Sequence, residues 1–155
     1  MHTSQEIDET LGRLAAAPGR FAAALSRLDD ADSVMGAGKE EWSPAEVLAH
    51  VRASHAILEP RIIQMLVRDN PPLPAFDERR WAEVARFGAV PVTASLELMA
   101  LQRKELVQAL KALRPEDWER TGAHEVNGQI TIYDVAKYIA DHDEEHCRQI
   151  EGGGG

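Results

Sequence analysis

Two histidines near the end of the chain have the spacing of a metal site. His142 and His146 are four residues apart within the stretch 141–150. On a helix this spacing stacks both imidazoles on one face, about one turn apart, where they can share one metal ion. The chain has six histidines, so such a pair also arises by chance. The alternative interpretation is a pair of hydrogen-bonded core histidines.

The helical phase of this stretch favours the metal interpretation. Stepping about 100° per residue, we find that His146 lies about 40° from His142. The apolar positions of the same helix fall within about 80° of His142: Val135, Tyr138, Ile139 and Ile150. Both imidazoles therefore belong to the predicted buried stripe. We expect the acidic Asp141 and Glu145 beside them to accept hydrogen bonds from the ligand rings.

A third ligand must come from another part of the chain, and residues 43–67 offer two histidines. His50 falls at the edge of the apolar stripe of this predicted helix, about 100° from Val51, whereas His55 lies about 40° from Val51. For either histidine alone, a hydrogen-bonded structural role is the alternative. Spacing does not choose between them. Glu46, one turn before His50, could support that ring or could cap the helix.

One arginine lies within an apolar face of a further predicted helix. Arg103 is about 40° from Met99 on the helix over residues 92–113. A guanidinium in such a position must find a carboxylate or an anionic ligand, because an unpaired buried charge costs several kcal/mol. We therefore consider Arg103 as a substrate contact. A salt bridge to an acidic side chain of another helix is the alternative.

The elements that carry these residues predict an all-α four-helix bundle. Amphipathic periodicity indicates long helices over residues 3–28, bent at Pro18, and over 43–67, 92–113 and 131–150. Residues 29–41 form the predicted first loop. The Pro-rich stretch 70–74 begins one long crossover with a short helix at 77–87, and Asn127-Gly128 indicates a tight turn that could support a two-stranded ribbon.

Composition fits one soluble domain over residues 1–151, followed by a glycine tail at 152–155 that we expect to be disordered. The chain of 155 residues is 44% hydrophobic and 28% charged, with a formal net charge of −9. This acidic balance argues against nucleic acid or an anionic membrane as the main partner. We see no secretory signal or long apolar run and expect a cytoplasmic protein. Cys147 is the single cysteine, which excludes an internal disulfide and a multi-cysteine zinc site.

Motifs at both ends of the chain resemble the DinB-like superfamily of four-helix metal proteins. The early motif is Trp42-Ser43-Pro44-Ala45-Glu46-Val47-Leu48-Ala49-His50. The late motif comprises Gly128, Thr131, Asp134, His142-Asp143, His146 and Gln149-Ile150. The two motifs are some ninety residues apart and occur in the family's order. The resemblance extends from about Leu11 to Ile150.

This resemblance implies a divalent metal ion held by His50, His142 and His146. Zinc is the first expectation, with nickel, iron or manganese as alternatives. The resemblance also implies a thiol-dependent S-transferase or isomerase that uses a low-molecular-weight thiol, acts on a small electrophile and forms a homodimer. The alternatives are a metal-dependent hydrolase and a non-catalytic metal-binding stress protein.

The predicted ligand count fits catalysis. Three neutral imidazoles leave at least one position on the ion open, where a water or a thiol can bind and lose its proton more easily. Cys147 lies about 140° from His142 around the helix and should point away from the site. The thiol is therefore expected to come from a second small molecule.

Overall fold

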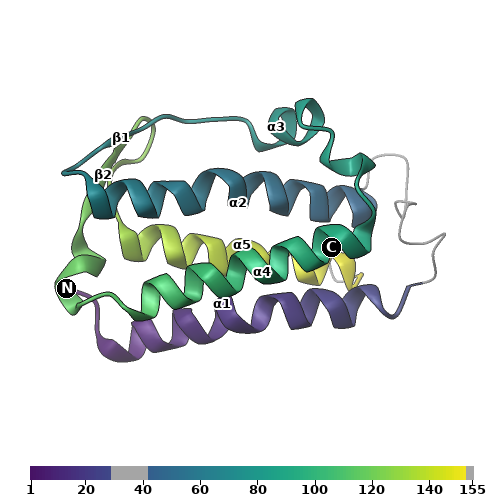
Figure 1. Cartoon of the computed structure of the whole chain (residues 1–155), viewed down its shortest axis with the longest axis horizontal. Helices are drawn as coiled ribbons and strands as arrows, with labels where there is room; N and C mark the ends of the chain where they lie inside the picture. The colour runs from purple at the N-terminus through teal and green to yellow at the C-terminus, as the bar shows by residue number, and fades with distance from the viewer. Residues whose placement is uncertain (29–41, 153–155) are drawn as a thin grey trace.

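Four long helices dominate the computed structural model, which describes residues 1–28 and 42–152 (Figure 1). They are α1 (Ser4–Leu25), α2 (Pro44–Val67), α4 (Val92–Lys111) and α5 (Ile132–Ile150). The predicted four-helix bundle is confirmed. The predicted loop at 29–41 and residues 153–155 of the glycine tail lie outside the described residues.

The two helices that carry the histidine candidates begin at the predicted caps. The Ser43 hydroxyl accepts a hydrogen bond from the Glu46 N–H, while the Glu46 carboxylate accepts one from the Ser43 N–H. Thr131 and Asp134 make the same reciprocal pair at the start of α5. These caps satisfy N–H groups that a helix start otherwise leaves free, and so fix where each helix begins.

The helix at the N-terminus differs slightly from the prediction. It ends at Leu25 instead of Leu28, and Pro18 lies within it. α1 packs against α4 and α5, and α2 packs against the same two helices. The interior holds two apolar clusters, one around Leu14, Ile62 and Ile139 and the other around Phe21, Val47 and Met99.

The long crossover runs along the outside of α2 (Figure 1). It contains β1 (Pro72–Leu73), α3 (Glu78–Val84) and the 3-10 turn η1 (Phe87–Ala89). The predicted ribbon is present as the antiparallel strands β2 (Thr121–His124) and β3 (Gly128–Thr131). β1 adds a parallel third strand to β2.

The third strand was missed because its sequence is Pro-rich. The carbonyls of Pro71 and Leu73 accept hydrogen bonds from the N–H groups of Ala123 and Glu125, and accepting needs no proline N–H. Gly122 lies close beneath this strand, where a Cβ atom would be 2.5 Å from Leu73 Cδ1. The absence of a side chain at Gly122 therefore allows the crossover to pack against the ribbon.

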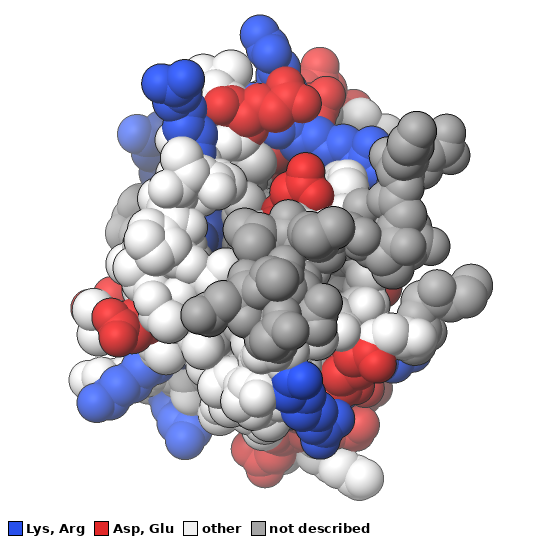
Figure 2. Space-filling model, turned by 90° about the vertical axis from the view of Figure 1, so that its right-hand side faces the viewer, with Lys and Arg blue, Asp and Glu red and all other residues white. Residues whose placement is uncertain are grey.

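The surface is mixed in charge at the end of the bundle that carries the start of α2. Figure 2 shows acidic and basic side chains interspersed there, without a continuous area of one sign among the described residues. Within the described ranges, no helix is long and apolar enough to cross a membrane.

Candidate metal centre

Three histidines from two helices converge on one point. The Nε2 atom of His142 lies 3.0 Å from Nε2 of His50 and 3.1 Å from Nε2 of His146. One ligand-type nitrogen of each ring lies within 4.8 Å of the other two. α2 supplies His50, and successive turns of α5 supply the other two imidazoles.

The structure also distinguishes His50 from His55. The His55 ring is fully buried and its Nε2 lies 3.1 Å from Asp143 Oδ1, away from the cluster. His50, His142 and His146 are buried but, at 8%, 7% and 9% exposed, are less enclosed than His55, and His50 lines a pocket. The position of His50 at the edge of the apolar stripe therefore keeps its ring partly exposed, as a reactive site requires.

The two most enclosed rings of the cluster are neutral at physiological pH. Burial, followed by the effects of the neighbouring His146 and His50, lowers the pKa of His142 to about 3. Burial, followed by the effects of His146 and Arg79, lowers the pKa of His50 to about 4. A neutral imidazole keeps the nitrogen lone pair that binds a metal.

The two separations from His142 fit a shared ion. Two nitrogens about 2.1 Å from one ion, at angles of roughly 90° to 110°, are about 3.0 to 3.4 Å apart. The observed 3.0 and 3.1 Å match the lower end of that range. Hydrogen bonding among the three rings cannot satisfy them all, since a neutral imidazole has only one N–H. The donor set, with three imidazoles and no thiolate, suits a divalent transition metal.

One residue supports the cluster from behind and was not assigned a role from the sequence. His146 Nδ1 donates a hydrogen bond to Gln149 Oε1 over 2.9 Å, which leaves the lone pair of Nε2 free for a metal. Gln149 belongs to the late motif, and its position three residues after His146 is the signal that could have identified it. The Nδ1 atoms of His50 and His142 are buried without a protein partner among the described residues.

The three carboxylates expected to support the ligands have other positions. Glu46 accepts hydrogen bonds from Ser43 at the helix cap, so capping takes its carboxylate. Asp141 pairs with Arg13 and Lys137 on the outer surface. Glu145 is exposed and has no ion pair within the described residues. Among the described residues, none of the three carboxylates hydrogen-bonds to His50, His142 or His146, although Glu46 lines a pocket together with His50.

Replacement of Gln149 by Ala is expected to weaken metal binding by about 10-fold, because loss of a partner that orients a ligand ring typically costs 10- to 100-fold. A competition titration against a chelating indicator measures this change. Glu46→Ala is the control: it should cost about 1 kcal/mol of stability through the cap and leave metal affinity unchanged. Equal metal affinities in the Gln149 variant and the wild type contradict the assignment.

Arg103 is not a substrate contact at the cluster. Its side chain is only 1% exposed, and Nη2 lies 2.6 Å from Asp143 Oδ2. The guanidinium also contacts His55 Nε2. The alternative interpretation, a salt bridge to an acidic side chain of another helix, is therefore the observed one. This buried group joins α2, α4 and α5 directly behind the histidines.

Asp143, the ion-pair partner of Arg103, was not identified from the sequence, although its position on the helix was a signal. It lies about 40° from Ile139 on the helical wheel, within the buried stripe of α5. A carboxylate at such a position requires a cation, as the guanidinium on α4 requires an anion. Burial lowers the pKa of His55, so the ring beside them is neutral.

Glu59, which interacts with the charges of Arg103 and Asp143, makes the folding stability depend on pH. Burial raises its pKa to about 7 from an ordinary 4.5, although Arg103 opposes the shift. Between these values the unfolded chain loses the proton before the folded chain does, so folding stability falls as pH rises from about 4.5 to about 7. The stabilising effect of Glu59→Gln should therefore grow by about 1 to 3 kcal/mol over this window. Parallel urea-unfolding stabilities of variant and wild type across the window contradict this prediction.

Two aromatic residues border the cluster and lead to separate pockets. Trp42 packs on His50 with ring centroids 4.9 Å apart, and both line a pocket of about 300 Å³. On the other side, the Tyr138 ring stacks on His142 at 5.8 Å and lines a pocket of about 380 Å³. Tyr138, expected in the buried stripe, is 48% exposed because it forms the wall of this pocket.

Cys147 faces away from the cluster, as its phase predicted. The thiol is buried among residues of the Phe21 cluster, and burial raises its pKa. A thiol of this kind is a poor nucleophile at neutral pH.

Known proteins share this sequence pattern and this fold. The family model of the DinB superfamily matches residues 13–150. A protein of Oceanobacillus iheyensis named "Putative metal-dependent hydrolase" is 23% identical over 96% of this chain and 86% of its own length. A second protein of that organism with the same name is 30% identical over 70% of this chain and 63% of its own length.

A solved structure is similar over nearly the whole chain. YfiT from Bacillus subtilis superimposes with a TM-score of 0.89, at 19% identity, over 98% of this chain and 87% of that one. It is described as a probable metal-dependent hydrolase with an unusual four-helix bundle topology. This likeness concerns the fold, whereas the family match rests on the sequence. The chain belongs to the DinB superfamily.

Proposed function

We propose that this protein is a divalent-metal-dependent enzyme that transfers a low-molecular-weight thiol to a small electrophile. The observation that carries the proposal is the convergence of three Nε2 atoms, with separations of 3.0 and 3.1 Å, at the edge of the interior. A metal ion held there supplies Lewis acidity that eases loss of a proton from a thiol or a water. Relatives named as metal-dependent hydrolases support the metal requirement.

The surroundings of the cluster suit a reaction between two small molecules. A pocket adjoins His50 on one side, and another adjoins His142 through Tyr138 on the other. The thiol and the electrophile can therefore approach from different sides. In the transfer, the thiol sulfur bonds to the electrophilic carbon, the leaving group departs with the electron pair of its bond, and the thiol proton passes to solvent.

The protein's own groups position these reactants. Gln149 holds the His146 ring, while the buried group formed by Arg103, Asp143 and His55 fixes the three helices relative to one another. The buried Cys147 is not available as the nucleophile. A thiol-dependent reaction therefore takes its sulfur from a cofactor.

Hydrolysis is the second candidate. The names of the relatives favour it, and Glu78 provides a carboxyl in the pocket beside Tyr138. Burial raises the pKa of Glu78, which is the direction of shift that a carboxyl general acid or base requires. Hydrolysis would use water in place of the thiol.

A thiol-consumption assay separates the two reactions. Metal-loaded protein is mixed with an activated aryl chloride and a panel of small thiols, and loss of free thiol and release of chloride are followed together. Equal loss and release that depend on both the metal and His142 support transfer. Chloride release without thiol supports hydrolysis. No turnover under either condition, with metal bound, contradicts both and supports a non-catalytic metal-binding protein.

A further inference from the structure

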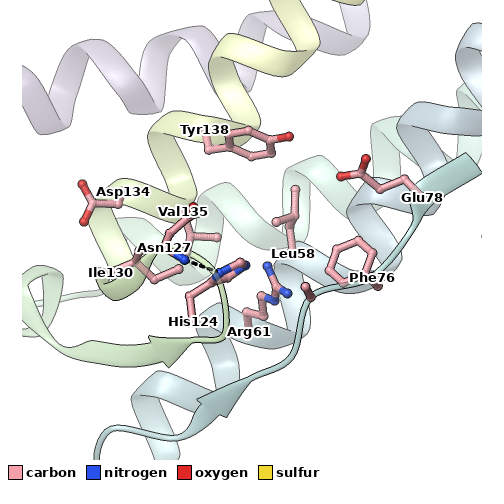
Figure 3. Close-up of a pocket in the computed structure, with 11 residues that line it drawn as sticks. Leu58, Arg61, Phe76, Glu78, His124, Asn127, Ile130, Asp134, Val135 and Tyr138 are labelled. Atoms are coloured by element: carbon pink, nitrogen blue, oxygen red, sulfur yellow. Dashed lines mark hydrogen bonds between the residues drawn. The ribbon is translucent and has the colours of Figure 1, made fainter.

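The pocket beyond Tyr138 contains a buried cation without a carboxylate partner. Figure 3 shows Arg61 of α2 and Tyr138 of α5 on opposite sides of this pocket, with Phe76 and Glu78 of the crossover toward one end. Arg61 is only 7% exposed. Among the described residues, no Asp or Glu forms an ion pair with it.

The contacts that Arg61 does make within the described ranges do not include a carboxylate. Nη2 donates to the Pro74 carbonyl, and the guanidinium carbon lies 4.6 Å from the centre of the Phe76 ring. A carbonyl and an aromatic face are weak counterparts for a buried cation. Burial lowers the pKa of Arg61, and the acidic groups of Glu78 and Tyr138 offset this only in part. Arg103, by contrast, is even more deeply buried, at 1% exposed, but is paired with Asp143.

The pocket has the size and lining of a small-molecule site. Its volume of about 380 Å³ falls in the range of such sites, roughly 300 to 1,000 Å³. Apolar side chains line much of it, including Leu58, Ile130 and Val135. Glu78 and Asp134 also line the pocket, and the Asp134 carboxylate is taken by the Thr131 cap. The fixed guanidinium is the group that suits a compact organic anion, because its fork of N–H groups matches a carboxylate.

The pocket lies next to the histidine cluster, with Tyr138 between them. Tyr138 forms its wall and stacks on His142. Along α2, Arg61 is about 10 Å from Ser54, at 1.5 Å per residue, and Ser54 Oγ lies 3.4 Å from His142 Nε2. A molecule held by its carboxylate at Arg61 must extend about 10 Å along α2, the length of a short peptidic thiol, to come beside Ser54 and His142.

We propose that Arg61 anchors the carboxylate of a small substrate or thiol cofactor in this pocket, with the opposite end of that molecule beside His142. The placement of the reacting end rests on the proposed function. The carboxylate anchor does not, and it can be tested in protein stripped of metal. The competing explanation is that Arg61 only fastens the crossover through Pro74 and Phe76.

The test compares acids with their neutral amides by titration calorimetry in the presence of a chelator. Benzoate against benzamide represents an aromatic substrate, and N-acetylcysteine against N-acetylcysteinamide represents a carboxylate-bearing thiol. In one of the two pairs we expect the acid to bind at least 10-fold more tightly than its amide. The pair that shows this preference tells whether the substrate or the thiol carries the carboxylate. Arg61→Gln should abolish the preference, and Arg61→Lys should retain part of it.

Arg52→Gln is the matched control. Arg52 lies on the same helix, bonds to Ser95 and covers the Phe87 ring at 4.4 Å, but lies outside the pocket. The Arg52→Gln variant should keep the full preference for the acid over its amide. Equal binding of acid and amide in both pairs, no binding of either acid at millimolar concentration, or an undiminished preference in Arg61→Gln overturns the proposal. If Arg61→Gln does not fold by thermal melting, the wild-type comparison and Arg61→Lys decide the result.

Discussion

Replacing Asp143 by Asn is expected to destabilise the protein by about 3 to 5 kcal/mol, because it leaves the Arg103 guanidinium buried without its counter-charge. The ion pair joins α5 to α4 in an interior where both side chains are 1% exposed. Water therefore cannot replace the lost partner. Urea unfolding followed by circular dichroism measures the change.

Asp141→Asn provides the control for this variant. Asp141 is two residues away and also forms ion pairs, but its side chain is 46% exposed. Its loss should cost less than about 1 kcal/mol. A double variant, Asp143→Leu with Arg103→Met, should recover much of the stability, because it removes both charges together. A cost below about 1 kcal/mol for Asp143→Asn contradicts this description of the interior.

Replacing His142 by Ala is expected to lower the affinity for a divalent metal by more than about 100-fold, beyond the usual cost of losing a residue that only orients a ligand. His142 is the central ring, since its Nε2 lies near those of both His50 and His146. Without it, two imidazoles remain. Removal of a buried ring also leaves a small cavity, so stability must be measured separately.

A thermal shift assay detects this loss. Metal at 100 times its dissociation constant stabilises the folded wild type by about 2.7 kcal/mol, and the His142 variant should show almost no shift at that concentration. His124→Ala is the control, because His124 lies on β2 and bonds to backbone N–H groups of its own turn. An equal shift in the His142 variant and the wild type contradicts the assignment.

Helical periodicity predicted most of the fold and two of the three histidines of the cluster. The caps at Ser43 and Thr131 are local signals, so the starts of α2 and α5 could be read directly. The phase of α5 predicted that His142 and His146 are buried on one face. Strand β1 could not be predicted, because its pairing depends on the distant Ala123 and His124.

The remaining features depend on contacts between helices, which periodicity does not contain. Phase alone could not choose between His50 and His55; the resemblance to the family selected His50, and the structure brings it to the cluster. Phase showed that Arg103 needs a counter-charge but not that Asp143 provides it. For Glu46 the sequence left two roles open, and the geometry at Ser43 selects the cap.

X-ray absorption of the zinc-loaded protein tests the central claim most directly. The account predicts one bound ion per chain, with a first shell that contains three imidazole nitrogens at about 2.0 to 2.1 Å and at least one further light atom. In His142→Ala the same spectrum should lose an imidazole contribution or show no bound ion. A wild-type spectrum without three imidazoles, or one that is unchanged in the variant, contradicts a metal site formed by His50, His142 and His146.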